Sequence, residues 1–223
     1  MTIAAAPHPP SYYAHSAHAA PLRPPLSATA DADVCIVGAG YTGLSAGIAL
    51  AEAGKRVVIL EQSSVGWGAS GRNGGQIVHS YSRDLDVIEA KYGHAVAEPL
   101  GRMMFEGAQV LRERVAKYRI DCDLKDGGIF AAVNDAKARG LVEQKALWER
   151  WGHPGLTLVD RPAEVRKLLG TDRYSALLVD PTGGHFHPLN LALGEAAAFE
   201  TLGGTIHEAS GVTKIERGTP AIV

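Results

Sequence analysis

The stretch DVCIVGAGYTG, residues 33–43, decides the fold because it joins a strand to a helix through a glycine turn. Val34 to Val37 is a short apolar run, typical of a strand buried on both faces in a parallel sheet. The turn reads Gly-x-Gly-x-x-Gly, and an alanine-rich helix follows it as far as Gly54. Residues 56–60 supply a second apolar strand. This order predicts an α/β fold built on a Rossmann-like unit.

Each part of the unit suits a dinucleotide. Gly38 permits the tight turn, Gly40 lets a pyrophosphate approach the backbone, and Gly43 lets the helix lie close to the sheet. The helix N-terminus directs N–H groups toward the phosphates. Glu61 ends the second strand, where its carboxylate can accept both ribose hydroxyls. Three neighbours of these groups are further cofactor-binding candidates, namely Tyr41, Thr42 and Gln62.

The loop at residues 66–76 is too rich in glycine for a helix or a strand. A flexible linker shares this composition, but Trp67 and several polar side chains are costly to place in one. Glycines that admit a flat ring, with amides and a hydroxyl between them, suit the polar edge of a flavin. The candidate contacts are Gly68, Ser70, Arg72, Asn73, Gly74, Gly75 and Gln76. Arg72 could equally stabilise a reduced flavin or pair with a surface carboxylate.

Residues 37–44 and 68–76 together resemble the FAD-dependent amine and D-amino-acid oxidase superfamily. Residues 80–84, 103–107 and 183–191 resemble its members that act on gamma-glutamylputrescine-type amines. The resemblance implies a Rossmann-like FAD-binding domain of the GR2/DAO type with part of an α+β substrate domain. It also implies FAD as cofactor, contact of the Val212 backbone with adenine, and oxidation of a primary amine by dioxygen to aldehyde, ammonia and hydrogen peroxide. It assigns no catalytic residue within this chain.

The expected organisation has five parts. Residues 1–30 form a Pro/Ala-rich, solvated tail, in which only Ser11-Tyr12-Tyr13 could dock. A FAD-binding unit (31–83), a helical segment (84–121) and a partial substrate domain (122–188) follow, and 189–223 return to the FAD-binding domain. Since members of the superfamily are about twice as long, we expect an N-terminal half that binds FAD weakly and oxidises no amine alone.

Several element predictions can be checked directly. We expect a long helix that starts or kinks near Pro99, a hairpin around Asp126-Gly127, and a short strand at 176–179. The inward face of the long helix is predicted to carry Val96, Leu100, Met103, Met104, Ala108, Leu111, Val115 and Tyr118. Helices are expected from Asn134 or Asp135 to Trp151, at 162–169 and at 189–202, and strands at 205–208 and 212–216.

The net charge and the cysteine content limit the kinds of partner and the location to be expected. A net charge of -2 gives no reason to expect nucleic acid or an anionic membrane, so a small amine and dioxygen are the expected partners. Two cysteines form no disulfide framework, no secretory signal is apparent, and a reducing cytoplasm is the expected location. His185 and His187 have no third ligand near them in sequence, so no metal site is expected. His79 could approach the flavin, although an ordinary strand histidine is the simpler interpretation.

Other functions stay open. A glycine, sarcosine or D-amino-acid oxidase would share these motifs, and a nicotinamide-dependent dehydrogenase would share the nucleotide unit. A non-catalytic truncated fragment is the alternative outside enzymology. Residues 34–51 are apolar enough to suggest a membrane span, but a span gains nothing from three spaced glycines.

Overall fold

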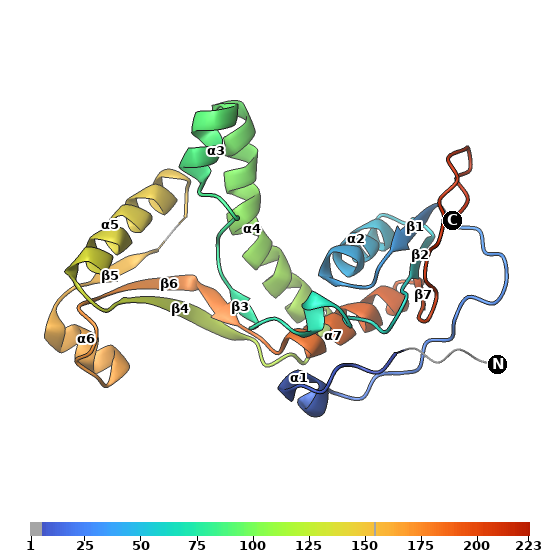
Figure 1. Ribbon diagram of the computed structural model, residues 1–223, viewed down its shortest axis with the longest axis horizontal. Helices are drawn as coiled ribbons and strands as arrows, with labels where there is room; N and C mark the ends of the chain where they lie inside the picture. Colours follow the sequence, from blue (N-terminus) through green and yellow to red (C-terminus); the bar gives the residue numbers. More distant parts are fainter. Residues whose placement is uncertain (1–5, 154) are drawn as a thin grey trace. The chain divides into compact units, whose positions relative to one another are not determined.

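The computed structural model describes residues 6–153 and 155–223, which form two compact units (Figure 1). The first unit contains the chain up to Gly75, Val115–Cys122 and His187–Val223. The second contains Gln76–Arg114 and Asp123–Phe186. The chain therefore leaves the nucleotide unit at Gly75, earlier than the expected boundary at residue 83. Residues 1–5 of the predicted tail lie outside the described residues.

The first unit is built on a parallel sheet with the strand order β1-β2-β7. The strands are β1 (Val34–Val37), β2 (Val57–Leu60) and β7 (Thr205–His207). Helices α2 (Tyr41–Glu52) and α7 (Pro188–Thr201) pack with the sheet around one apolar core. Leu44, Ile48, Ile59 and Phe199 are fully buried in it. The predicted Rossmann-like arrangement is confirmed.

Strand β1 differs from the prediction in its burial. Val34 and Ile36 pack against the core, whereas Cys35 is exposed and Val37 is 55% exposed. The prediction of a strand buried on both faces is wrong for the residues described, because β1 is an edge strand and the core covers only one of its faces.

The N-terminal segment is mostly exposed over the described residues 6–30, but it is attached to the first unit at several points. Helix α1 (Tyr12–Ser16) is capped by the Ser11 hydroxyl, which accepts from the Ala14 N–H at 3.1 Å. Ser16 Oγ lies 3.1 Å from His187 Nε2. Arg23 is 6% exposed, and its guanidinium donates two hydrogen bonds to Glu200. Polar contacts therefore hold this segment, in which Arg23 is the one buried residue among those described.

The second unit contains an antiparallel sheet in which β4 (Lys125–Ala132) and β6 (Ala176–His185) pair along most of their length (Figure 1). Strands β3 (Gln76–Ile77) and β5 (Thr157–Val159) also pair with β6. The helices are α3 (Leu85–Tyr92), most of α4 (His94–Tyr118), α5 (Asp135–Arg150) and α6 (Pro162–Leu169). The predicted bounds of α5 and α6 are confirmed to within a residue.

The structure differs from the hairpin and strand predictions for this unit, and it places the start of the long helix five residues before Pro99. Asp126-Gly127 forms no hairpin, since both residues lie inside β4, where the register to β6 shifts between Asp126 and Gly128. The strand predicted at 176–179 continues to His185, because β4 and β3 supply partners along its whole length. Helix α4 begins at His94, after Gly93, and runs through Pro99.

The predicted inward face of α4 is confirmed in part, since Ala108 is buried and Leu100, Met104, Leu111, Val115 and Tyr118 are half-buried. The buried residues of the helix are Ala97, Gly101 and Ala108, whereas Val96 and Met103 are 45% and 61% exposed. Small residues occupy the contact because a neighbour approaches closely. A Cβ on Gly101 would lie 2.9 Å from the Trp151 ring.

Residues 212–216 form no strand, contrary to prediction. Only an isolated bridge joins Glu216 to Ile222, and Val212 lies in an irregular segment. Within the described parts of the chain, no helix has both the length and the apolarity that a membrane crossing requires.

Candidate functional site

The glycine turn between β1 and α2 has the shape that its sequence predicts. Gly38 has a φ of 98°, a conformation that residues with a side chain rarely adopt, and its N–H donates to the Leu60 carbonyl at 2.8 Å. A Cβ on Gly43 would overlap the Gly38 carbonyl oxygen. The turn is therefore tight, and α2 begins directly against it.

Ser70 lies at the N-terminus of α2. Its hydroxyl accepts from the Tyr41 N–H at 3.0 Å, and a Cβ on Gly40 would lie 2.9 Å from the same oxygen. The first intrahelical bond of α2 runs from the Leu44 N–H to the Gly40 carbonyl. The N–H groups of Thr42 and Gly43 precede it and have no acceptor within the helix, as at any helix start. They face the space where an anion binds at a helix N-terminus.

The Glu61 side chain, after the end of β2, is hydrogen-bonded to the backbone of the glycine turn and of the next loop. Its Oε2 accepts from the Ala39 N–H at 2.8 Å, and its Oε1 accepts from the Ser63 N–H at 2.8 Å. Because each carboxylate oxygen has two lone pairs, Glu61 keeps acceptor capacity for the two hydroxyls of a ribose. The backbone N–H groups also hold the carboxylate in place beside the turn.

The glycine-rich loop folds back onto this turn through Asn73. Its amide nitrogen donates to the Ser70 carbonyl at 2.9 Å, and its oxygen accepts from the Gly75 N–H at 2.8 Å. The Tyr41 hydroxyl donates to the Pro188 carbonyl at 2.9 Å, and burial raises its pKa above the ordinary value. A short 3-10 helix, Ala69–Gly71, places Ser70 toward the turn. The loop is thus ordered by its own polar residues.

The other predicted contacts are distributed around the site. Arg72 donates to the Gly68 carbonyl at 3.1 Å and stacks over the Trp67 ring at 4.8 Å, so neither of its two expected roles is decided. Gly68 and Gly74 are exposed, and Gly75 is buried. Gln62 is exposed next to Gly211, whose Cβ would lie 3.4 Å from the Gln62 Cβ. Gln76 begins β3 and belongs to the second unit, and Val212 is half-buried.

The residues of the first unit fit the ADP part of a flavin dinucleotide. A Cβ on Gly38 would meet open space, whereas Gly40 and Gly43 permit the close approach of Ser70 and of the Gly38 carbonyl. The N-terminus of α2 lies directly after this turn, where the pyrophosphate of a dinucleotide would lie. Glu61 stands at the carboxyl end of β2, where the ribose of such a cofactor would lie. These groups are of the kind that can hold and orient a nucleotide.

Two buried groups near this site were missed by the sequence interpretation. Glu208 follows β7 and accepts from the Val65 N–H at 2.9 Å, and Arg23 lies 3.8 Å from its carboxylate. Burial raises the pKa of the Glu208 carboxyl, although the Val65 N–H and the Arg23 charge act against the rise. The signal was weak, because an arginine among prolines and a glutamate at a strand end are both ordinary surface patterns.

His79, a candidate for approaching the flavin, is buried inside the second unit. Its Nδ1 lies 3.3 Å from the Met104 carbonyl and its Nε2 lies 2.9 Å from the Thr182 hydroxyl. Burial lowers the pKa of the imidazole, and the Met104 carbonyl and Asp180 oppose the shift. The residue therefore belongs to a separate cluster in that unit. The predicted strand position for His79 is also wrong, since β3 ends at Ile77.

His185 and His187 do not form the paired face that a strand would give them. His185 is the last residue of β6 and is exposed. His187 caps α7, where its Nδ1 accepts from the Asn190 N–H at 3.1 Å.

Comparison with known proteins gives a consistent result. The family model described as FAD dependent oxidoreductase matches residues 33–223. The gamma-glutamylputrescine oxidoreductase of Escherichia coli strain K12 is 53% identical over 216 residues, which are 97% of this chain and 50% of that protein. The glycine oxidase of Geobacillus kaustophilus is 30% identical over 182 residues, 79% of this chain and 45% of that protein.

A solved structure shows the same fold. The L-amino acid deaminase of Proteus myxofaciens aligns with a TM-score of 0.72 at 21% identity, over 91% of this chain and 43% of that one. This chain spans about half the length of the curated relatives it matches.

Proposed function

Because the chain belongs to the FAD dependent oxidoreductase family, we propose that it binds the ADP part of FAD for the oxidation of an amine. The observation that carries this proposal is the arrangement of the glycine turn and Glu61. The bare backbone of the turn and the Glu61 carboxylate, linked by the Ala39 N–H, stand where a pyrophosphate and a ribose are bound in such units. FAD is the cofactor of the family, which favours it over the nicotinamide alternative.

The proposed substrate is a primary amine of the gamma-glutamylputrescine type. Support comes from the 53% identity to the Escherichia coli gamma-glutamylputrescine oxidoreductase over nearly the whole chain. Bound FAD would accept the two electrons that are lost when the amine is oxidised to an imine. The imine hydrolyses to aldehyde and ammonia, and dioxygen is reduced to hydrogen peroxide. Within this chain, Glu61 and the N-terminus of α2 bind and orient the cofactor. Asn73 keeps the glycine-rich loop folded against the turn.

A peroxide assay tests the activity. We expect the purified chain to bind FAD weakly and to release no hydrogen peroxide from gamma-glutamylputrescine. A protein that spans the full length of the relatives should release peroxide and show bleaching of the flavin absorbance. Sustained turnover by this chain alone would contradict the proposal that it binds FAD without oxidising the amine by itself.

A second candidate is oxidation of glycine or a related amino acid. The 30% identity to the Geobacillus kaustophilus glycine oxidase favours it. A panel of amines and amino acids, scored by the rate of flavin bleaching in a protein of the relatives' full length, separates the two candidates. Faster bleaching by glycine than by gamma-glutamylputrescine would select the second.

The cysteines agree with the expected location. Cys35 and Cys122 are not joined by a disulfide, and partial burial raises the pKa of the Cys35 thiol. A reducing compartment such as the cytoplasm remains our prediction for the protein.

A further inference from the structure

Three buried side chains with metal-binding atoms meet inside the second unit. His79 follows β3, His153 follows α5, and Asp180 lies within β6. Their side chains are 2%, 0% and 2% exposed. One ligand atom from each lies within 4.8 Å of the others. Three elements therefore direct two imidazoles and a carboxylate to one point.

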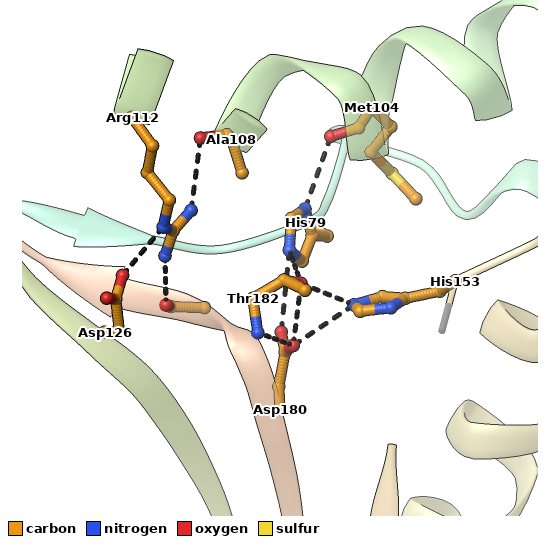
Figure 2. Close-up of polar contacts among 9 residues, drawn as sticks. His79, Met104, Ala108, Arg112, Asp126, His153, Asp180 and Thr182 are labelled. Carbon is orange, nitrogen blue, oxygen red and sulfur yellow. Dashed lines mark hydrogen bonds and ion pairs between the residues drawn. The ribbon is translucent and has the colours of Figure 1, made fainter. Parts of the chain in front are cut away.

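We propose that this cluster, together with the Thr182 hydroxyl, binds a divalent transition-metal ion, for which zinc is the best match. Thr182 Oγ1 lies 2.9 Å from His79 Nε2, 3.2 Å from His153 Nε2 and 2.9 Å from Asp180 Oδ1 (Figure 2). Asp180 Oδ1 lies 3.2 Å from His153 Nε2, and its Oδ2 lies 3.6 Å from His79 Nε2. Neighbouring ligand atoms around tetrahedral zinc lie about 3.3 Å apart. The two distances of 3.2 Å match this spacing, whereas those of 2.9 Å are shorter and that of 3.6 Å is longer, so a bound ion requires small shifts of these side chains.

The orientation of His79 suits a metal ligand. The Met104 carbonyl, 3.3 Å from Nδ1, can only accept a hydrogen bond, so Nδ1 carries a proton. The Nε2 of the neutral ring then presents its lone pair to the cluster. Histidines that bind zinc almost always donate their other N–H to a carbonyl or a carboxylate in this way.

The hydrogen bonds of the cluster compete for few protons. The Thr182 hydroxyl carries one proton but lies within hydrogen-bond distance of His79, His153 and Asp180. Asp180 also accepts from the Thr182 N–H at 2.9 Å and holds a buried negative charge. A cation at the centre satisfies several lone pairs at once and compensates that charge. The competing arrangement is a metal-free network in which His153 donates to Asp180 and Thr182 donates to His79.

The surroundings fix the rings and leave a route for an ion. His153 is stacked on Trp148 with centroids 5.4 Å apart, and Phe105 lies 4.6 Å from it. His153 and Thr182 also line a hollow of about 540 Å³. Four protein ligands fill a tetrahedral shell, so the ion would have a structural role. It would tie β6 to the loops that follow β3 and α5.

The site has no signature in the sequence. His79 and His153 are 103 and 29 residues from Thr182, so the ligands do not share a helix turn or a loop. The expectation of no metal site rested on residues that lie close together in sequence, and His79, His153 and Asp180 do not.

Metal content of the wild-type chain tests the proposal directly. The protein is stripped with a chelator, incubated with excess Zn²⁺ or Co²⁺, desalted, and measured by mass spectrometry of the metal. We expect about one ion per chain and, with Co²⁺, the intense visible absorbance of a tetrahedral site. Retention of less than about a tenth of an ion per chain, or only weak octahedral Co²⁺ bands, would support the metal-free network and overturn the proposal.

Matched variants locate the ion. His79→Gln and His153→Gln should each lower zinc affinity by more than about a hundredfold, because even changes outside the ligand shell cost up to that factor. His94→Gln is the control, since His94 is an exposed histidine of the same unit, 2.8 Å from Glu89. An equal loss in His94→Gln would refute the location. If the ligand variants do not fold, the melting temperature of the wild type is compared with and without zinc. A rise with zinc supports the site, because only a bound ion raises the melting temperature, and an unchanged value contradicts it. No flavin enters these assays, so their result is independent of the proposed function.

Discussion

Gly43 is the residue on which the geometry of the cofactor site depends most closely. A side chain there would overlap the Gly38 carbonyl and lie 3.2 Å from Ile36, so α2 and the turn would separate. Gly43→Ala should cost about 1–3 kcal/mol of stability through overpacking and lower FAD affinity by at least about tenfold. Gly140→Ala is the control, because a Cβ there, within α5, meets open space. It should add about 0.5–1 kcal/mol. Equal FAD affinity in both variants would contradict this account of the turn.

Glu208 should give the first unit a pH dependence of known sign. Burial raises the pKa of its carboxyl, Glu61 and Glu200 add to the rise, and the Val65 N–H and Arg23 oppose it. The folded state therefore holds the proton more tightly than the unfolded state, whose pKa is near 4.5. The stability that Glu208 contributes is complete below that pH and is lost as the pH rises through the folded pKa.

Glu208→Gln removes this titration and keeps an oxygen for the Val65 N–H. The melting temperature of the variant minus that of the wild type should therefore increase as the pH is raised from 4.5 to 8. A difference in melting temperature between Glu208→Gln and wild type that does not change with pH would contradict the raised pKa of Glu208.

At the scale of elements, α5 shows how a local signal fixes a helix start. The Asn134 side chain accepts from the Lys137 N–H at 3.0 Å, and Leu141 and Trp148 of the helix are buried. Asn134→Ala should destabilise the protein by about 1 kcal/mol in urea unfolding, whereas Asn134→Asp should keep the cap. Equal losses in the two variants would mean that the cap contributes nothing.

Elements set by neighbouring residues could be predicted, and those set by distant pairing could not. The caps of α5 and α6 and the glycine turn before α2 are written in adjacent residues. Asp126-Gly127 has the composition of a hairpin, because glycine supplies a positive φ. In the structure, the φ of 87° at Gly127 serves a register shift against β6, more than fifty residues away in sequence. Only the pairing with β6 shows whether Gly127 forms a hairpin turn or a register shift.

The same distinction holds for the sites. Gly38, Gly43 and Glu61 could be placed because one strand-helix-strand unit brings them together. His79, His153 and Asp180 come from three elements of the second unit, and only the sheet and the aromatic packing bring them together. Arg23 was assigned to a solvated tail because prolines surround it, yet its charge is paired inside the first unit.

At the scale of the whole molecule, Arg23 ties the N-terminal segment to the first unit. Its side chain is 3% exposed, and that of its partner Glu200 is 31% exposed. Arg23→Ala should cost about 2–3 kcal/mol, somewhat below the cost of breaking a fully buried pair. Arg56→Ala removes an exposed pair with Asp33 and should cost much less, because solvent screens such a pair. Thermal unfolding of both variants measures the difference, and equal costs would mean that the segment is not anchored by Arg23.

The chain covers about half the length of its relatives. The central claim is therefore that this chain binds the ADP part of FAD. The most direct measurement is a fluorescence titration with FAD, followed by displacement with ADP or with flavin mononucleotide. We predict saturable binding of FAD that ADP displaces and flavin mononucleotide does not. Glu61→Ala should weaken the binding by at least about tenfold, and Glu216→Ala should not. Displacement by flavin mononucleotide alone, or unchanged affinity in Glu61→Ala, would contradict the central claim.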